Sequence, residues 1–122
     1  MSLNHEGIEA ERMAFNLLKK NGYVIQQLDW IGKKNGQWTI FEVKHRELFN
    51  PPPFYGTGLD IRQLKLRKQL FNDLELRTYL LVFIKNSTDV YGQYLDTLEA
   101  GKYHDTKNGI RIYDIANFEK LQ

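Results

Sequence analysis

Two absences narrow the classes of protein that this sequence can encode. Its 122 residues include no cysteine, which excludes a disulfide framework, thiolate catalysis and a zinc–thiolate site. No apolar run approaches the roughly 18 residues of a membrane-spanning helix, and no signal-peptide pattern opens the sequence. We therefore expect neither a membrane span nor secretion, and we expect a cytoplasmic protein.

The sequence also has little net charge and few familiar catalytic motifs. Its formal charge is only +2 at pH 7, so binding to nucleic acid has to come from local clusters of Lys and Arg. It has no Ser/His/Asp arrangement, P-loop or dinucleotide-binding fingerprint. Because 42% of the residues are hydrophobic and no repeat or linker interrupts them, residues 1–122 are expected to form one domain.

The segment from Asp29 to Lys44 is the most informative part of the sequence. Asn35-Gly36 predicts a two-residue type I′ turn between two strands, since both turn positions need a positive φ. Alternation in the second strand places Trp38, Ile40, Glu42 and Lys44 on one face, and Thr39, Phe41, Val43 and His45 on the other. Glu42 and Lys44 are then about 7 Å apart along the strand. Asp29, on the facing strand, comes back toward Glu42.

This arrangement of charges has a chemical and a structural interpretation. Two carboxylates within reach of each other repel, and a divalent cation removes that repulsion. The carboxylates of Asp29 and Glu42 and a backbone carbonyl, such as that of Val43, suit Mg²⁺, and we expect Mn²⁺ to substitute. Lys44 would then orient or deprotonate an attacking water, or hold a phosphate. The alternative is a surface hairpin in which Glu42 and Lys44 form an ordinary ion pair that stabilises little.

An amphipathic helix is predicted before this hairpin, over residues 4–21. Apolar residues recur at helical spacing, and basic residues followed by Gly22 mark its end. Glu11 lies at the edge of the apolar stripe. It is either a boundary residue paired with a cation or, if the helix packs on the sheet, a neighbour of Asp29 and Glu42. Residues 23–28 are predicted to form a strand that leads into Asp29.

These segments resemble the PD-(D/E)XK nuclease superfamily. Over residues 7–46 the sequence is most similar to archaeal-type Holliday junction resolvases, which open with a Gly-x-x-Ala-Glu-Arg helix. The resemblance is carried by Gly7-Ile-Glu-Ala10-Glu11-Arg12, Leu17-Leu18-Lys-Lys20-x-Gly22-Tyr23-x-Ile25, Asp29 and Phe41-Glu-Val-Lys44. It implies an α/β fold with a restriction-endonuclease-like core, in the order α-β-β-β-α-β-β, and a mixed central sheet flanked by helices.

The same resemblance implies a function. The implied function is that of a Mg²⁺-dependent endonuclease that hydrolyses DNA phosphodiester bonds in recombination, repair or phage DNA processing. Glu11 would be the helix carboxylate, Asp29 and Glu42 metal ligands, and Lys44 the catalytic lysine, with a homodimer presenting two sites. The residues after Lys44 depart from the resolvases, which leaves the DNA structure open. A non-catalytic DNA-binding or assembly module on the same scaffold, and an RNA-directed nuclease, are the alternatives.

The loop at residues 45–58 holds the first candidate substrate contacts. All three prolines of the sequence lie here, with several aromatic residues and His45 and Arg46 beside the proposed site. The loop is either a strand-contacting flap or a packed crossover over a sheet edge. His45 points away from Lys44 if the strand persists, so it is expected to be structural or to face DNA.

A second helix is predicted over residues 59–75, after a capping box at Thr57-x-x-Asp60. Its apolar stripe consists of Leu59, Gln63, Leu66, Leu70 and Leu74, with Gln63 as the polar member that we place near the site. Its outer face is expected to be basic, through Arg62, Lys65, Arg67 and Lys68. Those side chains either contact phosphates or form a solvated helix surface.

The remaining sequence predicts three more strands. Residues 78–84 form a continuous apolar run, which is typical of a fully buried central strand. Residues 89–96 are expected to pair with it as an edge strand. A turn-rich stretch at 97–109 precedes a short strand at 110–113, and residues 115–118 are expected to dock the tail.

Overall fold

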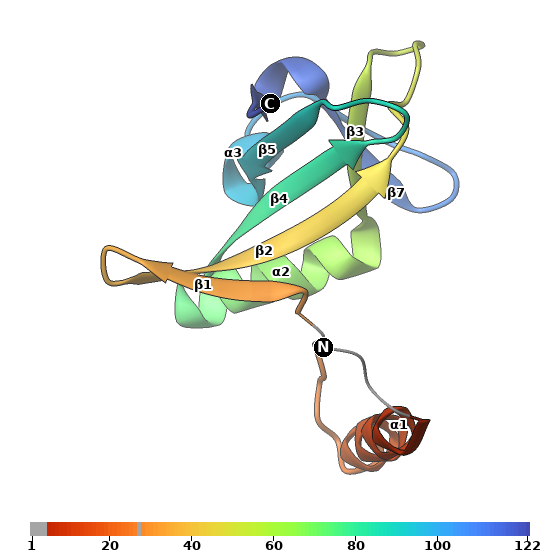
Figure 1. Cartoon of the computed structure of the whole chain (residues 1–122), viewed down its shortest axis with the longest axis vertical. Coiled ribbons are helices and arrows are strands. Elements are labelled where there is room, and N and C mark those ends of the chain that lie inside the picture. The colour runs from red at the N-terminus through yellow and green to blue at the C-terminus, as the bar shows by residue number, and fades with distance from the viewer. Residues whose placement is uncertain (1–4, 27) are drawn as a thin grey trace.

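The computed structural model describes residues 5–26 and 28–122 (Figure 1). Its helices are α1 (His5–Lys20), α2 (Ile61–Leu74), α3 (Leu95–Glu99) and a 3₁₀ turn, η1 (Ile115–Asn117). Its strands are β1 (Trp30–Lys34), β2 (Gln37–Arg46), β3 (Gly56–Asp60), β4 (Arg77–Ile84), β5 (Val90–Tyr94), β6 (Tyr103–Asp105), β7 (Ile110–Asp114) and β8 (Glu119–Lys120). Within these ranges, no helix is both long and apolar enough to cross a membrane.

The main sheet is mixed, as predicted. Its strand order is β1-β2-β4-β5-β8, with β2 and β4 parallel and the other pairs antiparallel. The β1–β2 hairpin forms at the predicted position, with Asn35 at φ 52° and Gly36 at φ 77°. In its register Trp30 faces Phe41, which places Asp29 beside the Glu42 end of that pairing. The predicted α/β class is therefore confirmed.

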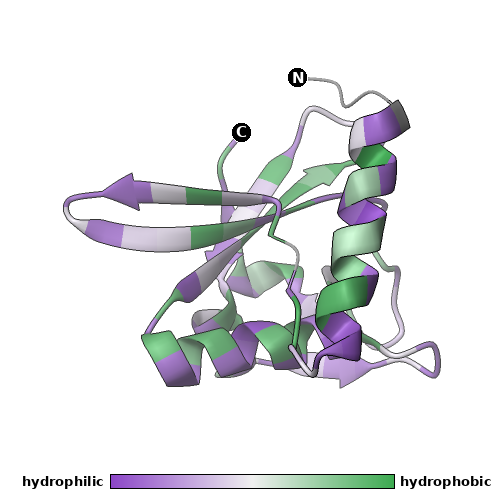
Figure 2. Cartoon of the chain, turned by 90° about the horizontal axis from the view of Figure 1, so that it is seen from below, coloured by the Kyte–Doolittle hydropathy of each residue, from purple (hydrophilic) through white to green (hydrophobic). Residues whose placement is uncertain are grey.

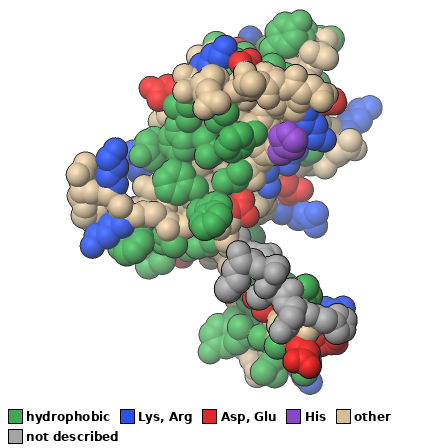
Figure 3. Space-filling model, in the orientation of Figure 1, with side chains coloured by type: hydrophobic (Ala, Val, Ile, Leu, Met, Phe, Trp, Pro, Cys, Tyr) green, Lys and Arg blue, Asp and Glu red, His purple; other side chains and the backbone are tan. Residues whose placement is uncertain are grey.

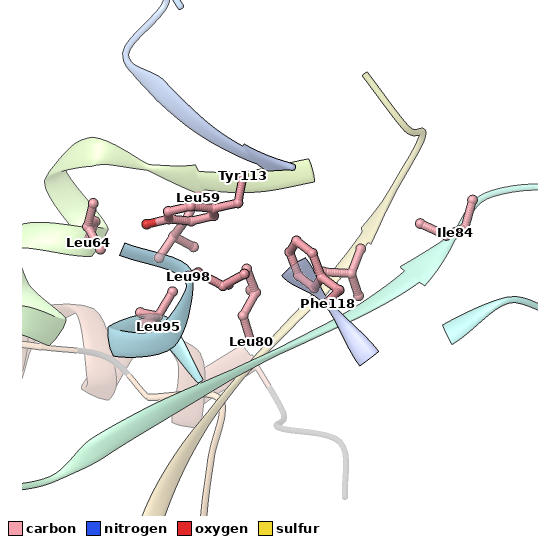
Figure 4. Packing of buried hydrophobic residues seen from close by; sticks show 9 residues of the cluster. Leu59, Leu64, Leu80, Ile84, Leu95, Leu98, Tyr113 and Phe118 are labelled. Atoms are coloured by element: carbon pink, nitrogen blue, oxygen red, sulfur yellow. The ribbon is translucent and has the colours of Figure 1, made fainter. Parts of the chain in front are cut away.

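One face of the main sheet is covered by α2, α3 and a second sheet, of order β3-β7-β6 (Figure 1). The core between these layers consists of Leu59, Leu64, Leu80, Val82, Ile84, Leu95, Leu98, Tyr113 and Phe118 (Figure 4). On β4 the buried residues alternate, so the apolar run predicted to be fully buried is covered on one face only. Phe83, on its other face, is 42% exposed.

The other face of the main sheet is open and apolar. Its surface hollow is lined by Trp30, Ile31, Gly32, Phe41, Val43, Leu81 and Phe83, and Figure 3 shows hydrophobic side chains gathered over this part of the sheet. We call these seven residues the open face. The side chains of Phe41 and Val43 point away from α2, because they alternate with the buried Ile40 and Glu42 along β2. Trp30 pairs with Phe41 and shares that direction, whereas Ile31 pairs with Ile40 on the opposite face of the sheet.

Helix α1 stands apart from the sheet, contrary to the expectation that it packs there (Figures 1 and 2). Its apolar residues are exposed, with Ile8, Phe15 and Leu18 showing 51%, 46% and 42% of their surface. The helix ends at Lys20, just before the predicted stop at Gly22, whose positive φ allows Tyr23 N–H to reach the Leu18 carbonyl. Amphipathic periodicity predicted the helix correctly, but it does not specify which surface the apolar stripe will contact.

Three strands precede α2, as predicted, but one of them comes from a different part of the sequence than expected. Residues 23–26 and Leu28 form no strand, and Gln27 lies outside the described residues. Instead, residues 56–60 of the Pro-rich loop form β3, which pairs with β7. A Cβ atom at Gly56 or Gly58 would overlap the backbone of β7. The glycines therefore permit a close strand approach.

The second half of the chain contains the predicted helix and strands with shifted boundaries, but the cap predicted at Thr57 is wrong, because Thr57 lies in β3. Asp60 caps α2, its carboxylate accepting from the backbone N–H of Arg62 at 2.8 Å, so the helix starts at Ile61 rather than at residue 59. The stretch expected to be turn-rich contains the end of α3 as well as β6. Phe118, 8% exposed, docks the tail against the core.

Candidate active site

Asp29 is held at the start of the hairpin by a backbone contact. Its Oδ2 accepts a hydrogen bond from the N–H of Val43 at 2.9 Å. The carboxylate stays exposed, yet it lies against the strand residue next to Glu42. The fold thus brings Asp29 to the second strand as the sequence predicted.

Glu42 is completely buried on the face of β2 that α2 covers. Both of its carboxylate oxygens accept hydrogen bonds. Oε1 accepts from Arg67 Nε at 2.7 Å and also from an Arg67 terminal nitrogen. Oε2 accepts from Gln63 Nε2 at 3.0 Å. A buried carboxylate is costly without such partners, and here both donors come from α2.

Lys44 joins this group through Gln63. Its Nζ donates to Gln63 Oε1 at 3.1 Å, so the amide of Gln63 bridges the ammonium of Lys44 and the carboxylate of Glu42. The polar residue on the apolar stripe of α2 therefore lies at the site, where the sequence placed it. The amide oxygen of Gln63 accepts from the Lys44 ammonium and its nitrogen donates to the Glu42 carboxylate, so the orientation of the amide is fixed.

The predicted basic outer face of α2 was wrong at Arg67, which is buried. The prediction placed it on the outer surface, but it is 2% exposed and forms an ion pair with Glu42. Its NH1 group also donates to Gln26 Oε1 at 2.7 Å, which ties the segment after α1 to α2. Arg67 lies one turn after Gln63, on the side facing β2, and a buried anion there outweighs the usual preference of arginine for solvent.

Glu11 is not brought to this group. It lies on the exposed helix α1, at a hollow shared with Gln26 and apolar residues of α1. Among the described residues, no three His, Asp or Glu side chains come together as a potential metal site. The convergence of Glu11 with Asp29 and Glu42 depended on α1 packing on the sheet, and that packing is not observed.

The other candidate contacts lie around the site at different depths. Lys44, His45, Arg46 and Lys85 line one surface hollow with Val43 and Glu47, and Lys85 was not foreseen from the sequence. Arg62 and Lys65 are exposed on α2. Lys68, in contrast, forms an ion pair with Glu99.

Glu99 is the centre of a second charged cluster, which sequence reasoning missed. It accepts from Tyr113 Oη at 2.9 Å and from Arg111 NH1 at 2.9 and 3.1 Å, and it pairs with Lys68. Burial raises the pKa of Glu99, but the hydrogen bonds from Lys68, Arg111 and Tyr113 outweigh burial and hold the pKa below its ordinary value. These partners come from α2 and β7, so spacing in the sequence did not reveal them.

A cavity of about 250 Å³ lies between the two charged groups. Its walls come from α2, the start of β4 and α3, and its lining consists of Arg67, Lys68, Phe71, Asn72, Thr78, Leu95, Asp96 and Glu99. The buried hydroxyl of Thr78 has no hydrogen-bond partner within the described part of the chain. Arg67 therefore borders both Glu42 on one side and this cavity on the other.

Comparisons with known proteins show what the chain is similar to in structure. No protein-family model matches the sequence, and no curated protein matches it. Among solved structures, the chain is similar to Archaeoglobus fulgidus Hjc, a Holliday junction resolvase from an archaeal hyperthermophile. The identity is 14%, 88% of each chain is covered, and the TM-score is 0.46. The function proposed for this chain therefore rests on the residues of its own site.

Proposed function

We propose that this chain is a divalent-metal-dependent endonuclease that hydrolyses DNA phosphodiester bonds, in recombination, repair or phage DNA processing. The observation that carries the proposal is a set of contacts along β2: Asp29 accepts from the Val43 N–H, and Gln63 bridges Glu42 and Lys44 on either side of Val43. Lys44 is linked to Glu42 through Gln63, which a chance surface ion pair would not require. Two carboxylates beside a positioned lysine are suited to metal-assisted hydrolysis.

The donor groups fit Mg²⁺ in kind. Asp29 and Glu42 offer hard carboxylate oxygens on adjoining strands, and Val43, between their contacts, offers a backbone carbonyl. A cation bound there would polarise the phosphate and lower the pKa of a bound water. Gln63 orients Lys44, whose ammonium would hold the attacking water or a phosphate oxygen.

Positive charge around Lys44 supports a polyanionic substrate. The hollow beside it also contains Arg46 and Lys85, both able to contact phosphate, and His45 at its rim. Arg62 and Lys65 extend basic surface along α2. Because the overall charge is low, this local cluster is what would bind the backbone of DNA.

The proposal is tested by separating cleavage from binding. Lys44→Ala and Asp29→Asn should each lower Mg²⁺-dependent cleavage by about 10³-fold, roughly 4 kcal/mol of transition-state stabilisation. DNA affinity should change little, because neither substitution removes most of the phosphate contacts. Cleavage is measured on linear duplex, single-stranded and four-way-junction DNA, and on a matched RNA. Lys107→Ala, an exposed lysine in the turn before β7, is the matched control.

A second function is favoured by the Glu42–Arg67 pair. A buried carboxylate that is ion-paired and has both oxygens hydrogen-bonded is also what a purely structural role would need. In that case the chain is a non-catalytic DNA-binding or assembly module. Cleavage by both site variants at the wild-type rate, or no cleavage by the wild type with Mg²⁺ or Mn²⁺, would favour this module over the enzyme.

The proposal includes a homodimer. Two apolar surfaces of this chain are exposed, the open face of the sheet and the apolar stripe of α1. A second copy can cover both at once, since a two-fold dimer exchanges the same surfaces in both directions. Two sites would then face one DNA molecule.

A further inference from the structure

Glu42 already has a cation in this structure. Arg67 donates twice to Oε1 and Gln63 donates to Oε2, so neither oxygen faces an open space. Both partners of the ion pair are buried, at 0% for Glu42 and 2% for Arg67. The buried carboxylate is therefore neutralised by the protein itself.

We infer that Arg67 competes with the divalent cation for Glu42, and that the cation binds only by exchange with the Arg67 guanidinium. The inference rests on the proposed function, because it concerns the metal site named there. It goes beyond that proposal by assigning a role to a residue outside the predicted ligand set. Arg67 would thus set the metal concentration at which the site becomes loaded.

Simultaneous binding is disfavoured by charge and by geometry. A metal ion and a guanidinium on the same carboxylate would place three positive charges around one negative charge. In a buried position such repulsion is weakly screened. Asp29 adds a second negative charge, but its carboxylate lies at the exposed edge, next to Val43 rather than Arg67. Loading of Glu42 therefore requires the guanidinium to move.

The structure provides room for that movement. Arg67 borders the cavity of about 250 Å³, whereas a water molecule takes about 30 Å³ of liquid volume. The side-chain amide of Asn72 lines the same cavity and can accept a hydrogen bond from a guanidinium. Asp96 also lines it, and although each of its oxygens accepts from Arg77, each keeps a further acceptor site. A short rotation of the side chain would exchange one carboxylate environment for another. The charge of Arg67 need not enter an apolar space.

The first experiment measures Mn²⁺ affinity in the absence of DNA, by calorimetry and electron paramagnetic resonance. Arg67→Gln should bind Mn²⁺ at the site about tenfold or more tightly, because the competing charged hydrogen bonds are gone. Lys107→Gln is the control, since it removes one positive charge at an exposed position outside both charged groups. Its affinity should stay within about twofold of the wild type, because exposed charges are screened.

Arg67→Lys separates competition from simple charge. If Arg67 acted only through its positive charge, the lysine variant would match the wild type. A lysine cannot hold Glu42 and Gln26 together in a planar fork, so competition predicts tighter Mn²⁺ binding than in the wild type. Equal Mn²⁺ affinity in the wild type, Arg67→Gln and Arg67→Lys would overturn the inference, while leaving a metal-dependent nuclease intact.

A second measurement needs no substitution in the test protein, should Arg67→Gln fail to fold. The Arg67 Nε–H, buried against Glu42, should give a slowly exchanging arginine signal in a ¹⁵N spectrum, assigned with Arg67→Lys. Mg²⁺ should shift or remove this signal with the same midpoint as metal binding by calorimetry. A signal that stays unchanged while the metal saturates the site would contradict exchange. Absence of any metal binding to wild type and folded Arg67→Gln would instead overturn both the inference and the metal dependence of the proposed function.

Discussion

At the scale of single residues, Glu42 shows how one buried charge determines its surroundings. A carboxylate with no exposed surface requires hydrogen-bond donors, and the chain supplies them from Gln63 and Arg67 on the facing helix. Gln63 then positions Lys44. The same contacts that would align a catalytic lysine also stabilise the packing of α2 on the sheet, so stability and chemistry are coupled here.

That coupling predicts that removing one partner of the Glu42–Arg67 ion pair lowers the free energy of unfolding more than replacing both partners with uncharged residues. Arg67→Ala should lower the free energy of unfolding by about 3–5 kcal/mol, because it leaves a buried carboxylate without its cation. The double variant Glu42→Gln with Arg67→Met should cost less than Arg67→Ala alone, since no buried charge remains. Urea denaturation at pH 7 measures both. Equal costs would show that the ion pair is solvated in solution.

The lowered pKa of Glu99 predicts that the free energy of unfolding decreases in acid. Its pKa is lowered in the folded state, so its contribution is present above the ordinary pKa of about 4.3 and is lost as the pH falls through the lower folded value. Glu99→Gln should be less stable than the wild type at pH 7, and its stability should fall less between about pH 5 and about pH 3. The measurement is urea denaturation across this range. The exposed Glu47→Gln serves as control, and equal slopes for both variants would contradict the assignment.

At the scale of elements, α2 shows what a helical pattern predicts and what it misses. The predicted stripe placed Gln63 correctly at the sheet, but it did not match the buried side of α2. Leu64, 1% exposed, lies outside that stripe, whereas Leu74, a member of it, is 63% exposed. Arg67 lies on that side too, but pattern rules assign arginine to solvent unless a buried partner is known. Its partner Glu42 is 25 positions away, on another element. The deciding contact was therefore tertiary, and local periodicity does not contain it.

Strand β3 was missed for a related reason. Gly56 and Gly58 have a low intrinsic preference for strands, and the sequence around them resembled a turn before a helix cap. Their use became visible only opposite β7, where any side chain would overlap the neighbouring backbone. By contrast, Asn35-Gly36 was decisive, because its turn conformation depends on two adjacent residues alone.

The basic face of α2, without Arg67, leads to a narrower prediction about DNA. Arg62, Lys65 and Lys68 are all exposed. Lys68, however, is held by the largely buried Glu99, whereas the contact of Arg62 with Asp60 is long, at 3.7 Å. Arg62→Gln with Lys65→Gln should reduce the slope of log affinity against log salt by up to about 0.9 for each duplex phosphate that the protein no longer neutralises. Lys68→Gln should change it less. A salt titration that gives the wild-type slope for the double variant would mean that this face does not touch DNA.

At the scale of the whole molecule, the position of α1 apart from the sheet leaves its apolar stripe uncovered. An isolated helix of 16 residues is marginal in water, and most of its stability must come from packing of its apolar stripe. The open face lies uncovered on the same chain. The stripe of α1 was predicted from sequence to be apolar, whereas residues 78–84, which supply Leu81 and Phe83 to the open face, were predicted to be fully buried. Which surface meets which depends on the arrangement of separate elements and on the number of chains.

The proposed dimer can be tested at these two surfaces. Phe15→Asp on α1 and Phe83→Asp on the open face should each convert a dimer into a monomer, because each places a charge in the apolar contact. Phe71→Asp on α2 is the matched control, since its 41% exposure is close to the 46% of Phe15 and the 42% of Phe83. Light scattering measures the solution mass. A wild-type monomer at high concentration, or dimers unaffected by both variants, would contradict the proposal.

Strand β1, finally, has a consequence for how copies of this molecule meet. It is the terminal strand of its sheet, so one row of backbone N–H and C=O groups has no neighbouring strand within the described part of the chain. Such a row can template the addition of another molecule and the growth of fibres. Here the strand has only five residues and ends in the exposed Lys33 and Lys34. An incoming strand would have to displace water from the two lysine ammonium groups, which disfavours open-ended growth along this row of backbone groups. Association of copies through side chains does not carry this penalty.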